Sequence, residues 1–415
     1  MGLPFLATLP LAEDRKRILG WMCLLIAVNQ LGFGTIVPVV PLYAESFGVS
    51  AAAVGLTIAI YGLARFLVNV PAGSFADRNG RRWTLAVGGL VTVLGNLLCA
   101  AAWNYPLFLV ARFVAGAGAA MVLTGGQIVL ADIASPQNRG RVMALYQGVF
   151  LFAVGAGPLP GGVLAAHLGL RAPFLANAAL AGVVALVAWF QVPETRDLRA
   201  DRQTAARHPA PPLRDQLRVL QATPGFLLIS LVSFVAFSAR TGALFNIIPL
   251  LAESKIGLGP DQIGLGLGLI SIVGLILAYP SGVLVDRFGR KAVIVPATAM
   301  TGAAMLLFAG SPSYALFLLA CGLWSVASGI GSSAPAAYAA DTAPPGMMAS
   351  ALGTYRTIAD LGYVVGPLAL GAMADLASPE AALASIATLL FLSAAAFAYL
   401  APESLEREPS GTTAP

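Results

Sequence analysis

Five charged residues lie inside long apolar runs of the sequence, where a charge can do chemistry that its neighbours cannot. One is a carboxylate, Asp360, and the other four are Arg65, Arg112, Arg240 and Arg356. A charge at membrane depth costs about 2.5–3.5 kcal/mol on insertion scales and usually faces a cavity or a partner. A carboxylate there can take up and release a proton, so Asp360 is the leading candidate for proton coupling.

Two interpretations of Asp360 stay open. Arg356 lies four residues earlier, so the two side chains share one helix face and can form a static ion pair. Alternatively, Asp360 exchanges a proton during the working cycle, with Arg356 as its partner. If Asp360 does not titrate, the next candidates are Glu45 and Glu253, which lie near the outer ends of their runs.

The elements that must position these charges are twelve apolar runs. The chain is 58% hydrophobic and only 10% charged, whereas soluble domains are about 25% charged. This composition excludes a soluble enzyme, a nucleic-acid-binding domain and a disordered chain. Since a bilayer core of about 30 Å needs about 20 apolar residues per helix, we predict an all-α membrane protein. The predicted spans are 18–43, 51–75, 83–103, 107–131, 142–166, 173–192, 225–252, 262–285, 292–310, 314–339, 351–374 and 380–401.

The basic residues predict the topology. Of the 24 Lys and Arg residues, 18 fall at the N-terminus, in every second loop or in the tail, which places both termini in the cytoplasm. The excess charge of +5 is thereby explained without a nucleic-acid partner. Of these 24 residues, 21 are arginine, which favours a GC-rich bacterium and hence the inner cell membrane.

Four segments are predicted. Residues 1–192 and 225–401 each form a six-helix half, 193–224 is a cytoplasmic linker, and 402–415 is a cytoplasmic tail. The linker is either a tether or a short helix lying on the membrane surface.

The two halves repeat each other at an offset of 209 residues. The segment from Gly73 to Arg82 recurs from Gly282 to Lys291, and Gly157-Pro158 recurs as Gly366-Pro367. The same offset relates Asp132 to Asp341, Tyr146 to Tyr355 and Pro193-Glu194 to Pro402-Glu403. Because six helices separate the copies, the halves have the same membrane orientation and form parallel repeats.

These residues resemble the major facilitator superfamily (MFS) along almost the whole chain. Its loop signature matches Gly73-x-x-x-Asp77-Arg78-x-Gly80-Arg81 and its copy Gly282-x-x-x-Asp286-Arg287-x-Gly289-Arg290. Arg112-x-x-x-Gly116-x-Gly118 is similar to a second motif, although the usual Gln is Ala115 here. The motif associated with antiporters is matched by Gly148, Gly155, Gly157, Pro158, Gly161 and Gly162.

The resemblance implies the twelve-helix drug:proton antiporter branch, working as a monomer by alternating access. It implies that the two loop signatures latch the halves on the cytoplasmic side, and that Arg112 takes part in proton coupling. It also implies a central cavity, for which our candidates are Asn29, Gln30, Tyr61, Arg65, Arg240, Phe245, Asn246 and Tyr355. Related exporters often carry an acidic group in the first span, whereas this chain has Asn29 and Gln30 there.

We therefore predict a secondary transporter that exports amphipathic drugs or small metabolites in exchange for protons. The deep charges sum to +3, four arginines against one aspartate, which keeps organic-anion exchange or uptake open as an alternative. A non-transporting membrane receptor or scaffold is a third interpretation, with only 193–224 available to bind a partner. No nucleotide-binding loop, metal cluster or catalytic constellation is found in the sequence, so we predict no cofactor, no metal and no enzymatic activity.

Overall fold

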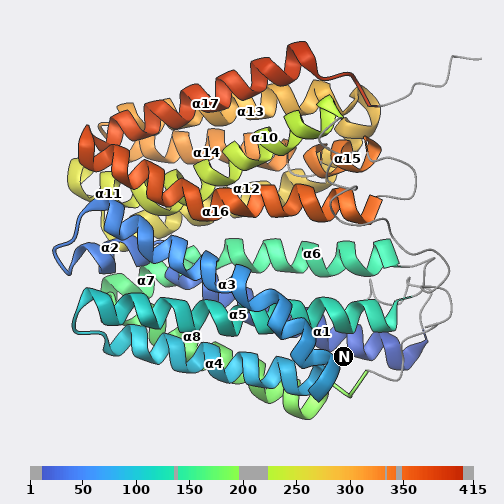
Figure 1. The fold of residues 1–415 in the computed structure, drawn as a ribbon. Coiled ribbons are helices and arrows are strands. Elements are labelled where there is room, and N and C mark those ends of the chain that lie inside the picture. The colour runs from blue at the N-terminus through green and yellow to red at the C-terminus, as the bar shows by residue number, and fades with distance from the viewer. Residues whose placement is uncertain (1–11, 135–138, 196–222, 332–333, 343–347, 405–415) are drawn as a thin grey trace, which may run out of the picture. The chain divides into compact units, whose positions relative to one another are not determined.

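The computed structural model describes residues 12–134, 139–195, 223–331, 334–342 and 348–404, and every regular element among them is a helix (Figure 1). The chain divides into two compact units. One comprises Met1–Pro209 with Phe245–Ile272, and the other comprises Ala210–Leu244 with Val273–Pro415. The predicted linker 193–224 and tail 402–415 lie mostly outside the described residues.

The first unit contains eight helices from its N-terminal segment, together with the later segment 245–272. The helices are α1 (Glu13–Ile36), α2 (Val40–Glu45), α3 (Ala51–Asn79), α4 (Arg81–Ala101), α5 (Tyr105–Ile133), α6 (Arg139–Ala156), α7 (Pro158–Leu168) and α8 (Ala172–Gln191). Later residues add α11 (Ile248–Leu251), η3 (Ala252–Ile256) and the beginning of α12 (Pro260–Phe288). Helix α4 packs against α5 and α8, and α1 packs against α6 and α8. Their inward faces form one apolar core that includes Leu19, Met22, Leu85, Val129 and Val184.

The second unit contains the remaining helices. They are α10 (Pro224–Ser238), the first part of the π-helix η2 (Ala239–Ile247), the rest of α12, α13 (Arg290–Gly310), α14 (Tyr314–Ile330), α15 (Ala334–Asp341), α16 (Met348–Leu376) and α17 (Pro379–Leu400). Its core holds Phe226, Ile294, Tyr338 and Phe397, and the Tyr338 hydroxyl donates to the Pro402 carbonyl at 2.8 Å.

The sequence repeat is also a repeat of helices. Helix α12 begins and ends 209 residues after α3, and α13 begins and ends 209 residues after α4. Side-chain caps fall at related places, since Asn104 caps α5 and Ser313 caps α14. The repeated segments therefore share their local geometry as well as their motifs.

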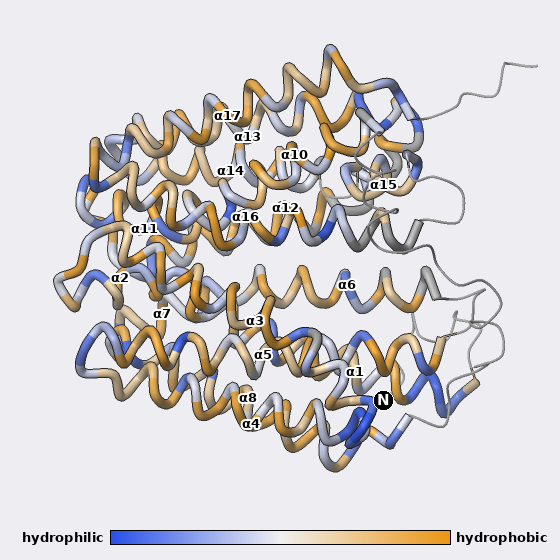
Figure 2. Tube along the Cα trace, viewed as in Figure 1, coloured by the Kyte–Doolittle hydropathy of each residue, from blue (hydrophilic) through white to orange (hydrophobic). Residues whose placement is uncertain are grey.

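Eleven of the described helical segments are long and apolar enough to cross a membrane, and a shorter apolar segment at 260–274 occupies the place of the eighth predicted span. Figure 2 shows hydrophobic residues along the helices and hydrophilic ones mainly near their ends. The prediction of an all-α membrane protein is thus confirmed.

Four predicted spans are not single α-helices. The run 225–252 passes from α10 through the π-helix η2 to α11, and the run 314–339 comprises α14 and α15. The other two are interrupted near prolines. The run 18–43 is interrupted between α1 and α2, where Pro38 provides no backbone N–H, and Pro41 follows in the first turn of α2. The run 142–166 is interrupted at Gly157, immediately before Pro158 begins α7. Proline at the first helical position is well tolerated because that N–H has no intrahelical partner.

Candidate functional site

A buried ion pair lies under the loop between α3 and α4. The Nε atom of Arg81 lies 2.9 Å from a carboxylate oxygen of Asp132, and both side chains are only 2% exposed. The Nη1 atom of Arg81 donates to the Ala76 carbonyl at 3.0 Å and lies 3.2 Å from the exposed Asp77 carboxylate. The Thr195 hydroxyl donates to Asp132 at 3.1 Å. Arg81 thereby ties the end of α3 to the end of α5.

Glu194, which follows the end of α8, also belongs to this network. Its carboxylate accepts the backbone N–H groups of Arg81 and Arg82, at 3.0 and 3.4 Å. A carboxylate at a helix N-terminus satisfies free N–H groups and complements the helix dipole. Gly80, with φ of 101°, has room for the Glu194 carboxylate only because it lacks a Cβ.

The second unit carries a copy of this network. Arg290 lies 3.0 Å from Asp341, and Glu403 accepts the backbone N–H groups of Arg290 and Lys291 at 3.0 and 3.1 Å. Gly289 has φ of 100°. The copy is more open to water, because the side chains of Arg290 and Asp341 are 14% and 32% exposed.

The structure brings together only some of the residues predicted for the gate. In the first copy Asp77, Gly80 and Arg81 join the network, whereas Arg78 is exposed and Gly73 has open space at its Cβ position. In the second copy, Gly289 and Arg290 join it, and the Arg287 guanidinium lies 5.5 Å from the Phe288 ring. Gly282 lies within α12, and the side chain of Asp286 is outside the described set.

Sequence reasoning missed the acidic partners of these arginines. Asp132, Glu194, Asp341 and Glu403 all lie far along the chain from the loops, so the loop motif gives no indication of them. The offset of 209 residues did relate them in pairs. Asp132 and Asp341 are related by the same offset of 209 residues as Arg81 and Arg290. That shared offset was the signal in the sequence that could have indicated the contact.

A small polar cavity lies inside the first unit. It is lined by Asn29, Phe33, Ile36, Tyr61, Thr92, Asn96, Ala115, Ala119 and Asn177. The Asn177 amide donates to Asn96 at 3.0 Å, and the Asn96 amide donates to the Thr92 carbonyl at 2.8 Å.

Of the residues predicted for a central cavity, Asn29 and Tyr61 line this one. Gln30 accepts a hydrogen bond from Asn29 at 2.8 Å, and Arg65 is half-buried one turn after Tyr61 on α3. Asn96 and Asn177 were not predicted.

Arg112 is buried beside this cavity, with 2% exposure. Its Nε donates to the Thr57 carbonyl at 3.2 Å, and its guanidinium carbon lies 4.5 Å from the centre of the Tyr61 ring. The Tyr61 ring also stacks with the ring of Phe33, with 5.3 Å between their centres. Among the described residues, Nη1 of Arg112 has no hydrogen-bond partner and no carboxylate lies within 4 Å. The guanidinium charge is therefore offset mainly by an aromatic face and a carbonyl.

In the second unit, Arg356 and Asp360 form the ion pair that their spacing allowed. Nε of Arg356 lies 3.2 Å from Asp360, and the side chains are 54% and 42% exposed. Arg356 also lies over the Phe237 ring at 5.5 Å. The neighbouring Tyr355 hydroxyl accepts a hydrogen bond from Ser233 at 2.8 Å. Asp360 is paired, and its side chain is partly exposed.

Three predicted cavity residues lie in the π-helix η2. Arg240 is exposed, with Arg356 and Tyr363 close enough to act on its charge, while Phe245 is half-buried and Asn246 is fully buried. π-Helical turns are rare and are often found at functional sites. The sequence did not predict this conformation, because hydropathy does not distinguish a π-helix from an α-helix.

The antiporter-like motif forms a close contact of backbones. Gly157 lies against Gly34 of α1, and Gly161 lies against the Thr35 carbonyl of the same helix. Gly162 lies against Pro260 and Gly264 of α12. Gly155 is buried, whereas Gly148 has open space where a Cβ would be. Glycines 157, 161 and 162 thus form a glycine seam that holds α7 against α1 and α12.

We expect Gly161→Ala to destabilise the protein by about 1–3 kcal/mol, the usual cost of overpacking. The new Cβ would overlap the Thr35 carbonyl, which as part of the backbone has little freedom to move. Thermal unfolding of the purified protein in detergent measures the loss. Gly148→Ala is the matched control, since it adds the same methyl group in the same motif without a neighbour. Equal unfolding midpoints for the two variants would contradict the assignment of the seam.

No group of three or more His, Cys, Asp and Glu side chains among the described residues is placed to hold a metal ion. Cys23, Cys99 and Cys321 are buried as free thiols.

Comparison with known proteins places these features in a family. The family model described as Major Facilitator Superfamily matches residues 22–259 and 229–414. Multidrug resistance protein 2 of Bacillus subtilis is 25% identical over 270 residues, covering 65% of this chain and 67% of that protein. Tetracycline resistance protein, class C, of Escherichia coli is 28% identical over 299 residues, covering 68% and 71%. The crystal structure of the human organic anion transporter MFSD10 (TETRAN) superposes with a TM-score of 0.66 at 20% identity, covering 92% and 99%.

Proposed function

The chain belongs to the Major Facilitator Superfamily, and from that membership we propose that it exports amphipathic drugs or small metabolites in exchange for protons. Membership makes it a multi-pass membrane transporter of small molecules and not an enzyme. The direction of transport, the proton coupling and the substrate class are the proposal.

The glycine seam is the observation that carries the proposal of export. Its three glycines belong to the antiporter-like motif, and their close contacts with α1 and α12 are made with backbone atoms. Two of the relatives named above, from B. subtilis and E. coli, are a multidrug resistance protein and a tetracycline resistance protein. Both observations favour export over uptake.

Proton coupling is assigned to Asp360 and Arg356. Their side chains are about half exposed, and we propose that water reaches the carboxylate during the transport cycle and delivers a proton to it. Protonation would remove the charge that holds Arg356 and would free its guanidinium for another partner. Arg112, a buried cation, is assigned a supporting role in the other half, where its charge favours a deprotonated or electron-rich partner nearby.

The paired loop networks are proposed to stiffen the cytoplasmic ends of the two halves. Each ties three helices of its own unit through one arginine and two carboxylates. A half that keeps its shape can rock as one body around a central site, as alternating access requires. We place both termini on the cytoplasmic side of the inner membrane, with the protein acting as a monomer.

Organic-anion exchange is the second candidate. Arg240 lies close enough to Arg356 for their charges to interact, and Arg356 pairs with one carboxylate, Asp360. These three residues together carry a net charge of +1. A substrate carboxylate or sulfonate would complement that charge.

Flux into proteoliposomes tests both functions. The purified protein is reconstituted, a pH gradient is imposed, and cationic, neutral and anionic amphipathic compounds are followed. We expect cationic and neutral compounds to accumulate inside the proteoliposomes only when the pH gradient is present. Their uptake should be accompanied by a matching flux of protons in the opposite direction. Anion transport that is unaffected by the gradient and stimulated by anions on the opposite side would instead establish the exchanger.

A further inference from the structure

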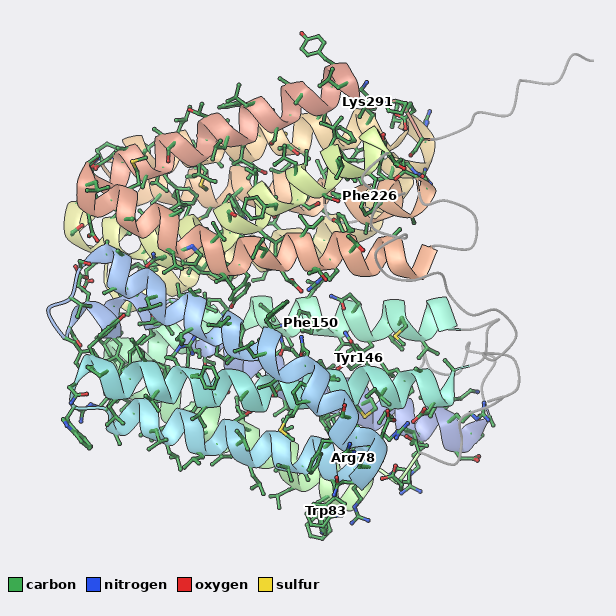
Figure 3. The ribbon with its side chains drawn as sticks, in the orientation of Figure 1. Arg78, Trp83, Tyr146, Phe150, Phe226 and Lys291 are labelled. Atoms are coloured by element: carbon green, nitrogen blue, oxygen red, sulfur yellow. The ribbon has the colours of Figure 1, made fainter. Side chains whose placement is uncertain are left out.

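Arg82, Trp83 and Trp189 form an aromatic and cationic cluster at one end of the first unit. The Arg82 guanidinium carbon lies 4.5 Å from the centre of the Trp189 ring, and the Trp83 ring meets Trp189 edge to face at 4.8 Å. Trp83 is 51% exposed, and Figure 3 shows it projecting outward from its helix. We call these three residues the Arg–Trp cluster.

The Arg–Trp cluster lies where an apolar outer surface ends. On α4, the exposed residues Leu90, Leu94 and Leu97 follow Trp83 at helical spacing. On the neighbouring α8, Leu186 and Phe190 are exposed on either side of Trp189 in the sequence. Large exposed apolar side chains on a membrane transporter face lipid, so the cluster sits at the level where acyl chains give way to headgroups.

The guanidinium of Arg82 is not used by the loop network beside it. The backbone N–H of Arg82 bonds to Glu194, and the buried ion pair is made by Arg81. Among the described residues, the side chain of Arg82 has no ion pair, and its buried Nε has no hydrogen-bond partner. Stacking on Trp189 holds the charge at the surface without neutralising it.

The internal repeat shows that the Arg–Trp cluster is not part of the shared fold. At the offset of 209 residues, Arg82 corresponds to Lys291, while Trp83 and Trp189 correspond to Ala292 and Ala398. The Lys291 ammonium group donates to the Ala401 carbonyl at 2.7 Å. The second half forms the same loop network without either tryptophan. The loop network therefore does not explain why the first half has the Arg–Trp cluster.

We propose that the Arg–Trp cluster is a headgroup site for an anionic phospholipid of the cytoplasmic leaflet. The Arg82 guanidinium would donate to the lipid phosphate, Trp83 and Trp189 would lie at the glycerol level, and the acyl chains would follow the exposed leucines of α4. Basic residues next to transmembrane helices attract anionic lipids, and tryptophan is enriched at this depth of the bilayer. Guanidinium groups bind phosphate strongly because their N–H donors match its oxygens.

The test measures binding of phosphatidylglycerol to the full-length protein in detergent by native mass spectrometry, with phosphatidylcholine as the uncharged comparison. We expect preferential retention of phosphatidylglycerol, and a drop of about fivefold in its affinity for Arg82→Ala, as expected for one basic residue near a membrane surface. Trp189→Ala should show a similar drop, because Arg82 loses its support. Inorganic phosphate should not compete, since it has no acyl chains.

Lys291→Ala is the matched control, because it removes a basic side chain at the equivalent position of the other half. Its lipid binding should equal that of the wild-type protein. Equal phosphatidylglycerol affinity for Arg82→Ala and wild type would overturn the proposal, as would an equal loss in Lys291→Ala. Competition by inorganic phosphate would also overturn it, since the site would then bind a free anion. Thermal unfolding of each variant without lipid verifies that every protein compared is folded.

Discussion

Asp360→Asn is expected to abolish accumulation of substrate against its gradient. Asparagine keeps the size of the side chain and can still accept a hydrogen bond from Arg356, 3.2 Å away in the native pair, but it cannot release a proton. A charge crossing a potential of 100 mV is worth about 2.3 kcal/mol, enough for a substrate gradient of about 50-fold per proton. Without coupling, the ratio of substrate concentrations across the membrane should fall to about one.

A second readout separates lost coupling from lost folding. Exchange of labelled for unlabelled substrate at equal concentrations needs no net proton movement, so Asp360→Asn should retain it. Asp360→Glu should recover part of the uphill transport, because the carboxylate is preserved. Full uphill transport by Asp360→Asn with an unchanged response to pH would show that the Arg356–Asp360 pair is only structural, and attention would pass to Glu45 and Glu253.

Asp132→Ala is expected to cause the largest loss of stability in the molecule. It leaves Arg81 charged and 2% exposed with no carboxylate at Nε, and breaking a buried ion pair in this way costs about 3–5 kcal/mol. The expected result is a markedly lower unfolding midpoint and a smaller monodisperse fraction in size-exclusion chromatography.

The repeat provides the control for this prediction. Asp341→Ala breaks the equivalent pair, whose carboxylate is 32% exposed, so water can solvate Arg290 and the cost should be nearer 1 kcal/mol. The double substitution Arg81→Met with Asp132→Leu should recover much of the stability, because no unpaired charge remains. Equal losses for Asp132→Ala and Asp341→Ala would mean that burial does not govern the energy of these pairs.

Much of the fold was predictable because a bilayer imposes one length scale and one polarity on every helix. The predicted run 83–103 differs from α4 by only two residues at each end. Interruptions were harder to predict, since Pro71 and Pro280 lie inside long helices whereas Pro158 begins a new one. What decides between these outcomes is tertiary packing, such as the contact of Gly157 with Gly34.

The site was predictable only where its members are neighbours in sequence. The Arg356–Asp360 pair follows from a spacing of four on one helix, and the structure has it. The Asn96–Asn177 hydrogen bond joins residues 81 positions apart, and each amide on its own is an ordinary polar residue within an apolar run. The functional roles assigned to these residues remain predictions for the experiments above.

The glycine seam has a consequence for the entropy of the transport cycle. When ordinary helices come together, each long side chain at the interface loses rotamer freedom, at up to about 2 kcal/mol apiece. Glycine has no rotamers to lose, so contact between Gly162 and Gly264 carries no such term. A contact made by backbone atoms alone can therefore form and separate without a change in side-chain rotamer freedom.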